Sequence, residues 1–188
     1  MFETLTLGPD DNDATLASRL RKALRSAGDA PLLIAGDFAR SFDDADAAFA
    51  WLGLLTTSQC LLALQAEGLL GQRGIALMLA CDLAFVGPTA ALDDAWRETP
   101  GLAALALRRS GSALARPLLL GGIETVDDMA EAGLVLPLAA LEEIADKLDD
   151  SHLAALRRRK RALRAAEALP FDEALRFDLA FLGKEAFA

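Results

Sequence analysis

The residue pattern best suited to chemistry is a glycine-bearing turn that runs directly into an apolar helix, at residues 67–83. Gly68, Gly71 and Gly74 lie in the turn, and the apolar run that follows ends at Cys81-Asp82. A helix that begins at such a turn leaves backbone N–H groups unpaired, and these groups stabilise an oxygen that carries negative charge. The pattern therefore predicts a site for an anionic oxygen at the start of this helix.

Few other side chains in the sequence suit catalysis. The 188 residues include one histidine, His152, no tyrosine and two cysteines, Cys60 and Cys81. Both cysteines lie in apolar runs, which indicates buried thiols in a reducing compartment rather than a disulfide framework. This composition excludes His/Cys metal clusters and most histidine acid/base chemistry, so no metal ligands are expected. The net charge of −9 argues against a nucleic-acid partner.

The elements that must position the turn alternate between apolar strands and helices. Hydrophobic residues make up 53% of the chain, enough for a folded domain with a core. Alternation of this kind predicts an α/β domain with mostly parallel strands. Strands are expected at residues 2–7, 31–36, 60–65 and 83–88, and helices at 13–26, 43–55 and 74–81.

From Gly101 onward the pattern is mainly helical. Thr125 begins a short capped helix, Gly133 ends it, and a strand follows at once. A long helix is expected over residues 138–164, and Pro170 is expected to begin a final one. The chain shows no secretory signal and no apolar run long enough to span a bilayer, so we expect a cytoplasmic protein without a membrane partner.

Three segments, in this order along the chain, resemble the crotonase (enoyl-CoA hydratase/isomerase) superfamily. Residues 32–43 are similar to its strand and Phe-Ser-x-Gly-x-Asp segment, and residues 121–135 to a turn and helix ending in Ala-x-x-x-Gly-Leu-Val. The turn described above matches at Gly68, Gly74, Leu77, Leu79, Ala80, Cys81 and Asp82. The resemblance implies an α/β fold with a ββα spiral core over residues 1–136. Residues 137–188 are then a helical C-terminal region of the same domain.

The resemblance also implies a site. Crotonase-like proteins bind an acyl-CoA thioester and hold its oxygen with two backbone N–H groups while an enolate forms. These donors fall on Phe42 and Arg73, and Phe38, Arg40 and Gly74 fall against the coenzyme A thioester. Because the family has glycine at the position of Arg73, three readings stay open there. The residue donates its N–H, it supplies its guanidinium to the oxygen or to a carboxylate substrate, or it faces solvent.

The acid/base residues that the family uses are missing. Ala76 and Trp96 stand where hydratases of the family carry glutamates, and hydration needs a base to activate water and an acid to protonate carbon. A shifted alignment brings in Asp94 or Glu98, and the alternative for both is an exposed acidic loop. The family's Gly-rich turn is reduced to Pro100-Gly101.

Two functions from different classes follow. The first is an enzyme of the enoyl-CoA hydratase/isomerase type, a lyase, an isomerase or a decarboxylase, that stabilises a thioester enolate. The second is an inactive crotonase-fold protein that binds a thioester or assembles with an active relative. Coenzyme A enters only as part of the substrate, and no other cofactor is expected. The resemblance and the phenylalanines at 171, 177, 181 and 187 predict a homotrimer or hexamer.

Overall fold

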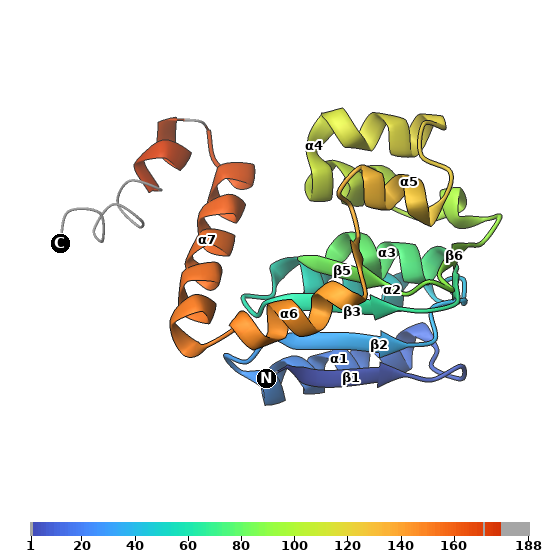
Figure 1. The fold of residues 1–188 in the computed structure, drawn as a ribbon, viewed down its shortest axis with the longest axis horizontal. Helices are drawn as coiled ribbons and strands as arrows, with labels where there is room; N and C mark the ends of the chain where they lie inside the picture. The colour runs from blue at the N-terminus through green and yellow to red at the C-terminus, as the bar shows by residue number, and fades with distance from the viewer. Residues whose placement is uncertain (1, 171, 178–188) are drawn as a thin grey trace. The chain divides into compact units, whose positions relative to one another are not determined.

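The computed structural model describes residues 2–170 and 172–177. Its contacts divide the chain into two compact units, Met1–Ala145 and Asp146–Ala188. The first unit holds both sheets and the helices around them (Figure 1). In the second unit, the described residues form helix α7 (Asp150–Ala168) and a helical stretch over residues 172–177, which follows Pro170 as predicted.

The main sheet is entirely parallel, in the order β1-β2-β3-β5-β7. Two further strands, β4 and β6, form a small parallel sheet of their own. The strands of the main sheet are β1 (Glu3–Leu7), β2 (Leu32–Gly36), β3 (Leu62–Ala66), β5 (Leu83–Val86) and β7 (Leu136–Pro137). The small sheet consists of β4 (Leu69–Leu70) and β6 (Ala91–Leu92). The alternation of parallel strands with helices along the chain confirms the predicted α/β class.

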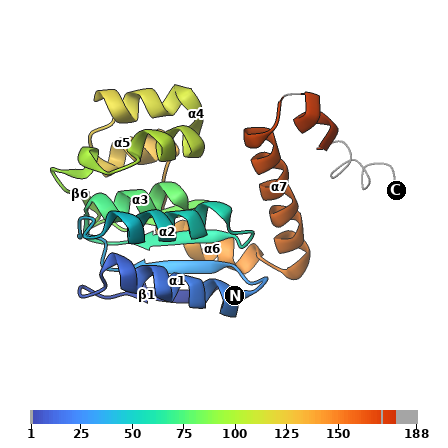
Figure 2. The ribbon, with the colours of Figure 1, turned by 180° about the vertical axis from the view of Figure 1, so that it is seen from behind.

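Helices cover both faces of the main sheet. Figure 2 shows α1, α2 and α3 on one face, and Figure 1 shows α6 on the other. Their bounds are α1 (Asp13–Ala27), α2 (Ala45–Thr57), α3 (Gln72–Ala80) and α6 (Ala139–Lys147). The chain between β6 and β7 forms a 3₁₀ turn η1 (Trp96–Glu98), then α4 (Leu102–Leu120) and α5 (Val126–Glu131).

Alternate residues of the central strands supply the two cores. Leu62 and Leu64 of β3 face the large cluster, which includes Trp51 of α2. Ala63, between them, faces a second cluster with Phe85, against which Ile144 of α6 packs. Strands with both faces covered read as continuous apolar runs, and this is why the sequence showed no alternation there.

Helix starts follow the polar residues in the sequence, with one correction. Asp44 caps α2 through Asp46 N–H and Ala47 N–H, both at 3.0 Å. The sequence predicts Asp13 as the cap of α1, but Asn12 has that role and accepts from Thr15 N–H at 2.7 Å. Asp13 is instead the first helical residue and is fully buried.

Three other features differ from the sequence-based expectations. The short strands β4 and β6 were not predicted, because two-residue pairings leave no periodic pattern. The helix expected at 138–164 breaks into α6 and α7, where Asp149 accepts from His152 N–H at 2.8 Å and caps α7. Helix α4 is interrupted at Gly111, whose φ of 66° lies in the left-handed region. Within the described residues, no helix is both long enough and apolar enough to cross a membrane.

Candidate functional site

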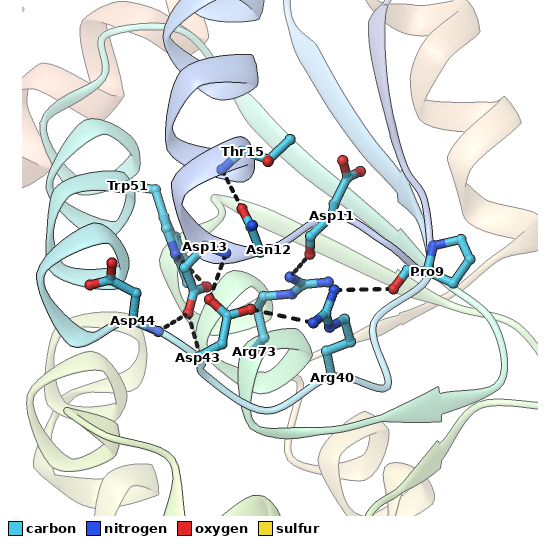
Figure 3. Close-up of polar contacts among 10 residues, drawn as sticks. All are labelled: Pro9, Asp11, Asn12, Asp13, Thr15, Arg40, Asp43, Asp44, Trp51 and Arg73. Carbon is cyan, nitrogen blue, oxygen red and sulfur yellow. Dashed lines mark hydrogen bonds and ion pairs between the residues drawn. The ribbon is translucent and has the colours of Figure 1, made fainter.

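Segments from three distant parts of the sequence meet at the start of α3 (Figure 3). They are the loop 8–12 after β1, the loop 37–44 after β2, and the first turns of α2 and α3. Parallel pairing places the carboxyl ends of β1, β2 and β3 at the same edge of the sheet, so the loops that follow them converge. This is the position where the sequence predicts a site for an anionic oxygen.

Backbone carbonyls of the protein itself occupy part of the N-terminus of α3. Gly71 N–H donates to the Phe38 carbonyl at 2.9 Å, and Arg73 N–H donates to the Arg40 carbonyl at 3.1 Å. A Cβ at Gly74 would lie 2.7 Å from the Phe38 oxygen. The glycines of the turn therefore permit close approach of the 38–40 segment. Phe38 and Gly74 are buried against each other. The oxyanion role predicted for Arg73 N–H requires the bond to Arg40 to open.

The side chain of Arg73 is fully buried, which contradicts the reading that it faces solvent. Its Nη1 donates to the Asp11 carbonyl, while Nε and Nη2 have no hydrogen-bond partner among the described residues. Burial is the main cause that lowers the pKa of Arg73, and the nearby carboxylates of Asp13, Asp43 and Asp11 oppose it. An arginine in this setting keeps its charge. The guanidinium faces this acidic cluster within the protein (Figure 3).

The loop 37–44 keeps free donors of its own. Among the described residues, nothing accepts a hydrogen bond from the backbone N–H of Arg40, Ser41 or Phe42. In this loop the sequence predicted Phe42 as a donor, beside Arg73 in α3, and placed Arg40 against coenzyme A. The Arg40 side chain is half-buried and reaches the Pro9 carbonyl at 3.2 Å and Asp43 at 3.4 Å. The three N–H groups together form the candidate oxyanion donors, and we call them the 40–42 segment.

A groove of about 350 Å³ opens beside Phe42. Its walls are mostly apolar, and among the described lining residues there is no lysine or arginine. The lining residues are Phe42, Asp43, Asp44, Ala45, Ala48, Phe49, Leu52, Pro100 and Gly101. The structure thus brings Phe42 together with the reduced Pro100-Gly101 turn, 58 positions further along the chain as numbered. An uncharged chain of a few carbons is the chemistry that such walls favour.

No carboxylate stands at the positions where the resemblance requires one. Ala76 is fully buried, and Trp96 is 3% exposed with the Arg97 guanidinium 4.6 Å from its ring centre. Asp94 and Glu98 are exposed, and neither lines the groove. The exposed acidic loop, the alternative that the sequence left open, is the arrangement found.

Cys60 and Cys81 are buried thiols outside any disulfide, as predicted. Among the described residues, no group of three or more His, Cys, Asp or Glu side chains is arranged to hold a metal ion. The phenylalanines at 171, 181 and 187, which the sequence assigned to an interface, lie outside the described residues.

Comparison with solved structures identifies the fold. An enoyl-CoA hydratase/isomerase family protein from Silicibacter pomeroyi is 23% identical, with 100% of this chain and 97% of that chain covered and a TM-score of 0.71. An enoyl-CoA hydratase from Polaromonas sp. JS666 is 19% identical, with coverage of 98% and 88% and a TM-score of 0.71. An enoyl-CoA hydratase/isomerase from Marinobacter aquaeolei is 14% identical, with coverage of 98% and 88% and a TM-score of 0.64.

This likeness establishes the crotonase fold, as the sequence predicts, over essentially the whole chain. No family model matches the sequence, and no curated protein matches it either. The fold is therefore established, but at this low sequence identity the function does not follow from the fold.

Two features of the site were beyond the sequence-based reasoning. The free N–H groups of Arg40 and Ser41 have no sequence signal, because backbone pairing is a property of the folded loop. Asp13, by contrast, did have a sequence signal. It directly follows Asn12, which is itself a favourable N-cap residue, so Asp13 was not needed as the cap. A surplus polar residue at a helix start can indicate a buried partner.

Proposed function

We propose that the chain is a member of the crotonase superfamily that binds an acyl-CoA thioester and does not hydrate it. The acyl group occupies the groove beside Phe42, and the thioester oxygen accepts from the 40–42 segment. The observation that carries this proposal is the unpaired backbone N–H of Phe42, a residue of the groove wall, directly after those of Arg40 and Ser41. Donors of this kind, held in place before the ligand arrives, are what a developing oxyanion needs.

The charges of the groove favour an uncharged acyl group. Asp43 and Asp44 lie on its wall and no cationic side chain is among the described lining residues. A carboxylate on the acyl group would meet repulsion there. Decarboxylation, which needs such a substrate, is therefore the least favoured of the reactions that the sequence left open.

Two observations favour binding without hydration. Ala76 and Trp96 offer no carboxylate, and Asp94 and Glu98 do not line the groove. General acid–base groups contribute roughly a hundred- to ten-thousand-fold each, so a site without them loses most of the hydration rate. We also propose that the chain assembles, either into a homotrimer or hexamer or with an active relative. Light scattering at micromolar concentration measures whether the chain alone forms a homo-oligomer.

The test of binding uses butyryl-CoA, a saturated thioester that cannot be hydrated, in calorimetric titration. Phe42→Ala keeps the backbone N–H and removes the ring, and Phe42→Pro removes the N–H as well. The pair Arg40→Ala and Arg40→Pro does the same at the other end of the segment. We expect one of the proline variants to bind up to about tenfold more weakly than its alanine partner, because one hydrogen bond contributes about 0.5 to 1.5 kcal/mol to binding.

Equal affinity within both pairs, and within the matching pair Ser41→Ala and Ser41→Pro, contradicts an oxyanion site in this loop when the variants are folded. Free coenzyme A is the control without a carbonyl, and succinyl-CoA tests the expected exclusion of a charged acyl group. Hydration of crotonyl-CoA should be absent. A kcat on the order of 10 per second, ordinary for an enzyme, would contradict the proposed loss of hydration, and Asp94 or Glu98 would then be the first residue to replace by alanine.

A further inference from the structure

Asp13 is a buried carboxylate that the thioester site does not use directly. It is fully buried at the first position of α1. One of its oxygens accepts from Asp43 N–H at 2.8 Å and from Asp44 N–H at 3.2 Å, and the other accepts from Trp51 Nε1 at 3.0 Å. Its own N–H donates to the Asp43 carboxylate at 3.0 Å. Figure 3 shows these contacts joining α1, the loop 37–44 and α2.

These contacts hold one end of the 40–42 segment, and α3 holds the other. Asp43 and Asp44 follow the segment directly and are tied to Asp13, while the Arg40 carbonyl is tied to Arg73 N–H. Between these points, Phe42 stacks on Trp51 with ring centres 5.7 Å apart and planes 5° from parallel. The 40–42 segment is thus held at both ends, while its three N–H groups stay without an acceptor.

We propose that Asp13 is a positioning residue for ligand binding, which fixes the direction of the N–H groups of the 40–42 segment. The effect of Asp13 on ligand binding rests on the proposed function, in which the 40–42 segment binds the thioester oxygen. A carboxylate suits the task, since it accepts several hydrogen bonds at once and needs no proton of its own. A neutral side chain with one acceptor oxygen cannot hold both the loop and Trp51.

The wild-type chain provides the first test, by amide hydrogen exchange. The Asp43 and Asp44 amides should exchange slowly, because a buried carboxylate holds them, whereas the amides of Arg40, Ser41 and Phe42 should exchange fast. Equal exchange across residues 40–44 overturns the inference. This measurement needs neither a variant nor a ligand, so its result does not depend on whether thioester binding occurs.

The second test compares Asp13→Asn with Asp46→Asn. Asp46 is exposed in the first turn of α2, so its variant removes the same charge near the same loop without touching these contacts. We expect Asp13→Asn to speed exchange at Asp43 and Asp44, to shift the Trp51 indole N–H signal, and to weaken butyryl-CoA binding by about tenfold or more. Asp46→Asn should change none of the three.

A folded Asp13→Asn chain with wild-type affinity and wild-type exchange overturns the positioning role. If Asp13→Asn does not fold, Trp51→Phe keeps an aromatic ring beside Phe42 and removes only the indole donor. It should leave the Asp43 and Asp44 amides protected and weaken binding less than tenfold, and loss of their protection contradicts Asp13 as the holding group. If the wild-type chain does not bind butyryl-CoA, the proposed function fails, and the exchange pattern alone decides whether Asp13 orders the segment.

Discussion

The two helices that begin beside the 40–42 segment satisfy their N-termini in opposite ways. Helix α3 begins at Gly71 without a side-chain cap, and carbonyls of the 38–40 segment pack directly onto its first turn. Helix α2 begins at Asp44, whose side chain caps it, and the same end opens onto the groove. We call the start of α3, on which backbone carbonyls pack, the closed end, and the start of α2, which lies beside the groove, the open end.

Because of this difference, we place the oxyanion site in the 40–42 segment rather than at the start of α3. The glycine turn predicted an anion site at the start of α3, and the structure pairs the Gly71 and Arg73 N–H groups of that start with the protein's own oxygens. In the loop before α2, by contrast, three consecutive N–H groups, those of Arg40, Ser41 and Phe42, have no acceptor among the described residues. A helix N-terminus has donors that must be satisfied, but the protein itself can satisfy them as well as a ligand can. Substitutions at the closed end and at the open end should therefore have different effects.

Restoring a carboxylate at the closed end should damage the fold rather than recover activity. Ala76 is fully buried in α3, so Ala76→Glu places a carboxyl group among apolar side chains without a partner. We expect a loss of at least about 3 kcal/mol in the free energy of unfolding, measured by urea titration, and no hydration of crotonyl-CoA. Ala50→Glu, at an exposed position of α2, should stay within about 0.5 kcal/mol of wild type.

Close packing at the closed end should make its glycines irreplaceable. A Cβ at Gly71 would meet the Ala39 carbonyl, whereas a Cβ at Gly53, inside α2, meets nothing within 4 Å. Gly71→Ala should therefore destabilise by about 1 to 3 kcal/mol. Gly53→Ala should stabilise by about 0.5 to 1 kcal/mol, because glycine is a poor helix residue. Similar thermal midpoints for the two variants would show that the 38–40 segment does not pack on α3 as described.

The open end depends on the side-chain cap of α2. Asp44→Ala removes the acceptor for Asp46 N–H and Ala47 N–H and should cost about 1 kcal/mol by urea titration. The variant also removes one negative charge from the groove, so succinyl-CoA should be excluded less strongly than by wild type. Asp46→Ala is the matched control, since it removes an exposed carboxylate from the same turn without a capping contact. An equal cost in both variants contradicts the cap.

The smallest effect is expected at a cap remote from both ends. Asp128 accepts from Glu124 N–H and Thr125 N–H, both at 2.9 Å, and Thr125 accepts in return. Its hydrogen bonds to Glu124 N–H and then to Thr125 hold the pKa of Asp128 below its ordinary value of 3.8. A lowered folded pKa contributes stability above the unfolded pKa, and that contribution is lost as pH falls through the folded value.

Wild type should therefore melt slightly above Asp128→Asn at pH 7, and the difference should shrink below about pH 4. Thermal midpoints measured from pH 7 to pH 2.5 check this. A difference that is constant across this range would mean that the carboxylate charge is not what stabilises the cap.

The sequence by itself determined the elements and their class. Apolar runs such as residues 31–36 and 83–88 predicted strands within a residue or two of β2 and β5, because burial on both faces demands continuous hydrophobicity. The sequence alone also showed that the two glutamates are absent, because Ala76 and Trp96 cannot act as acid or base in any fold. The order of three loose motifs was enough to predict the crotonase fold.

Only the tertiary structure decided which groups remain free. Arg73 is a charged residue in a turn, and nothing in its neighbours along the chain says that it is buried against Asp11, Asp13 and Asp43. Whether a backbone N–H is paired depends on which carbonyl lies opposite it, and that carbonyl belongs to a segment more than thirty positions away. Residue types fix what a group can donate or accept, but the packing of distant loops decides whether a ligand can reach it.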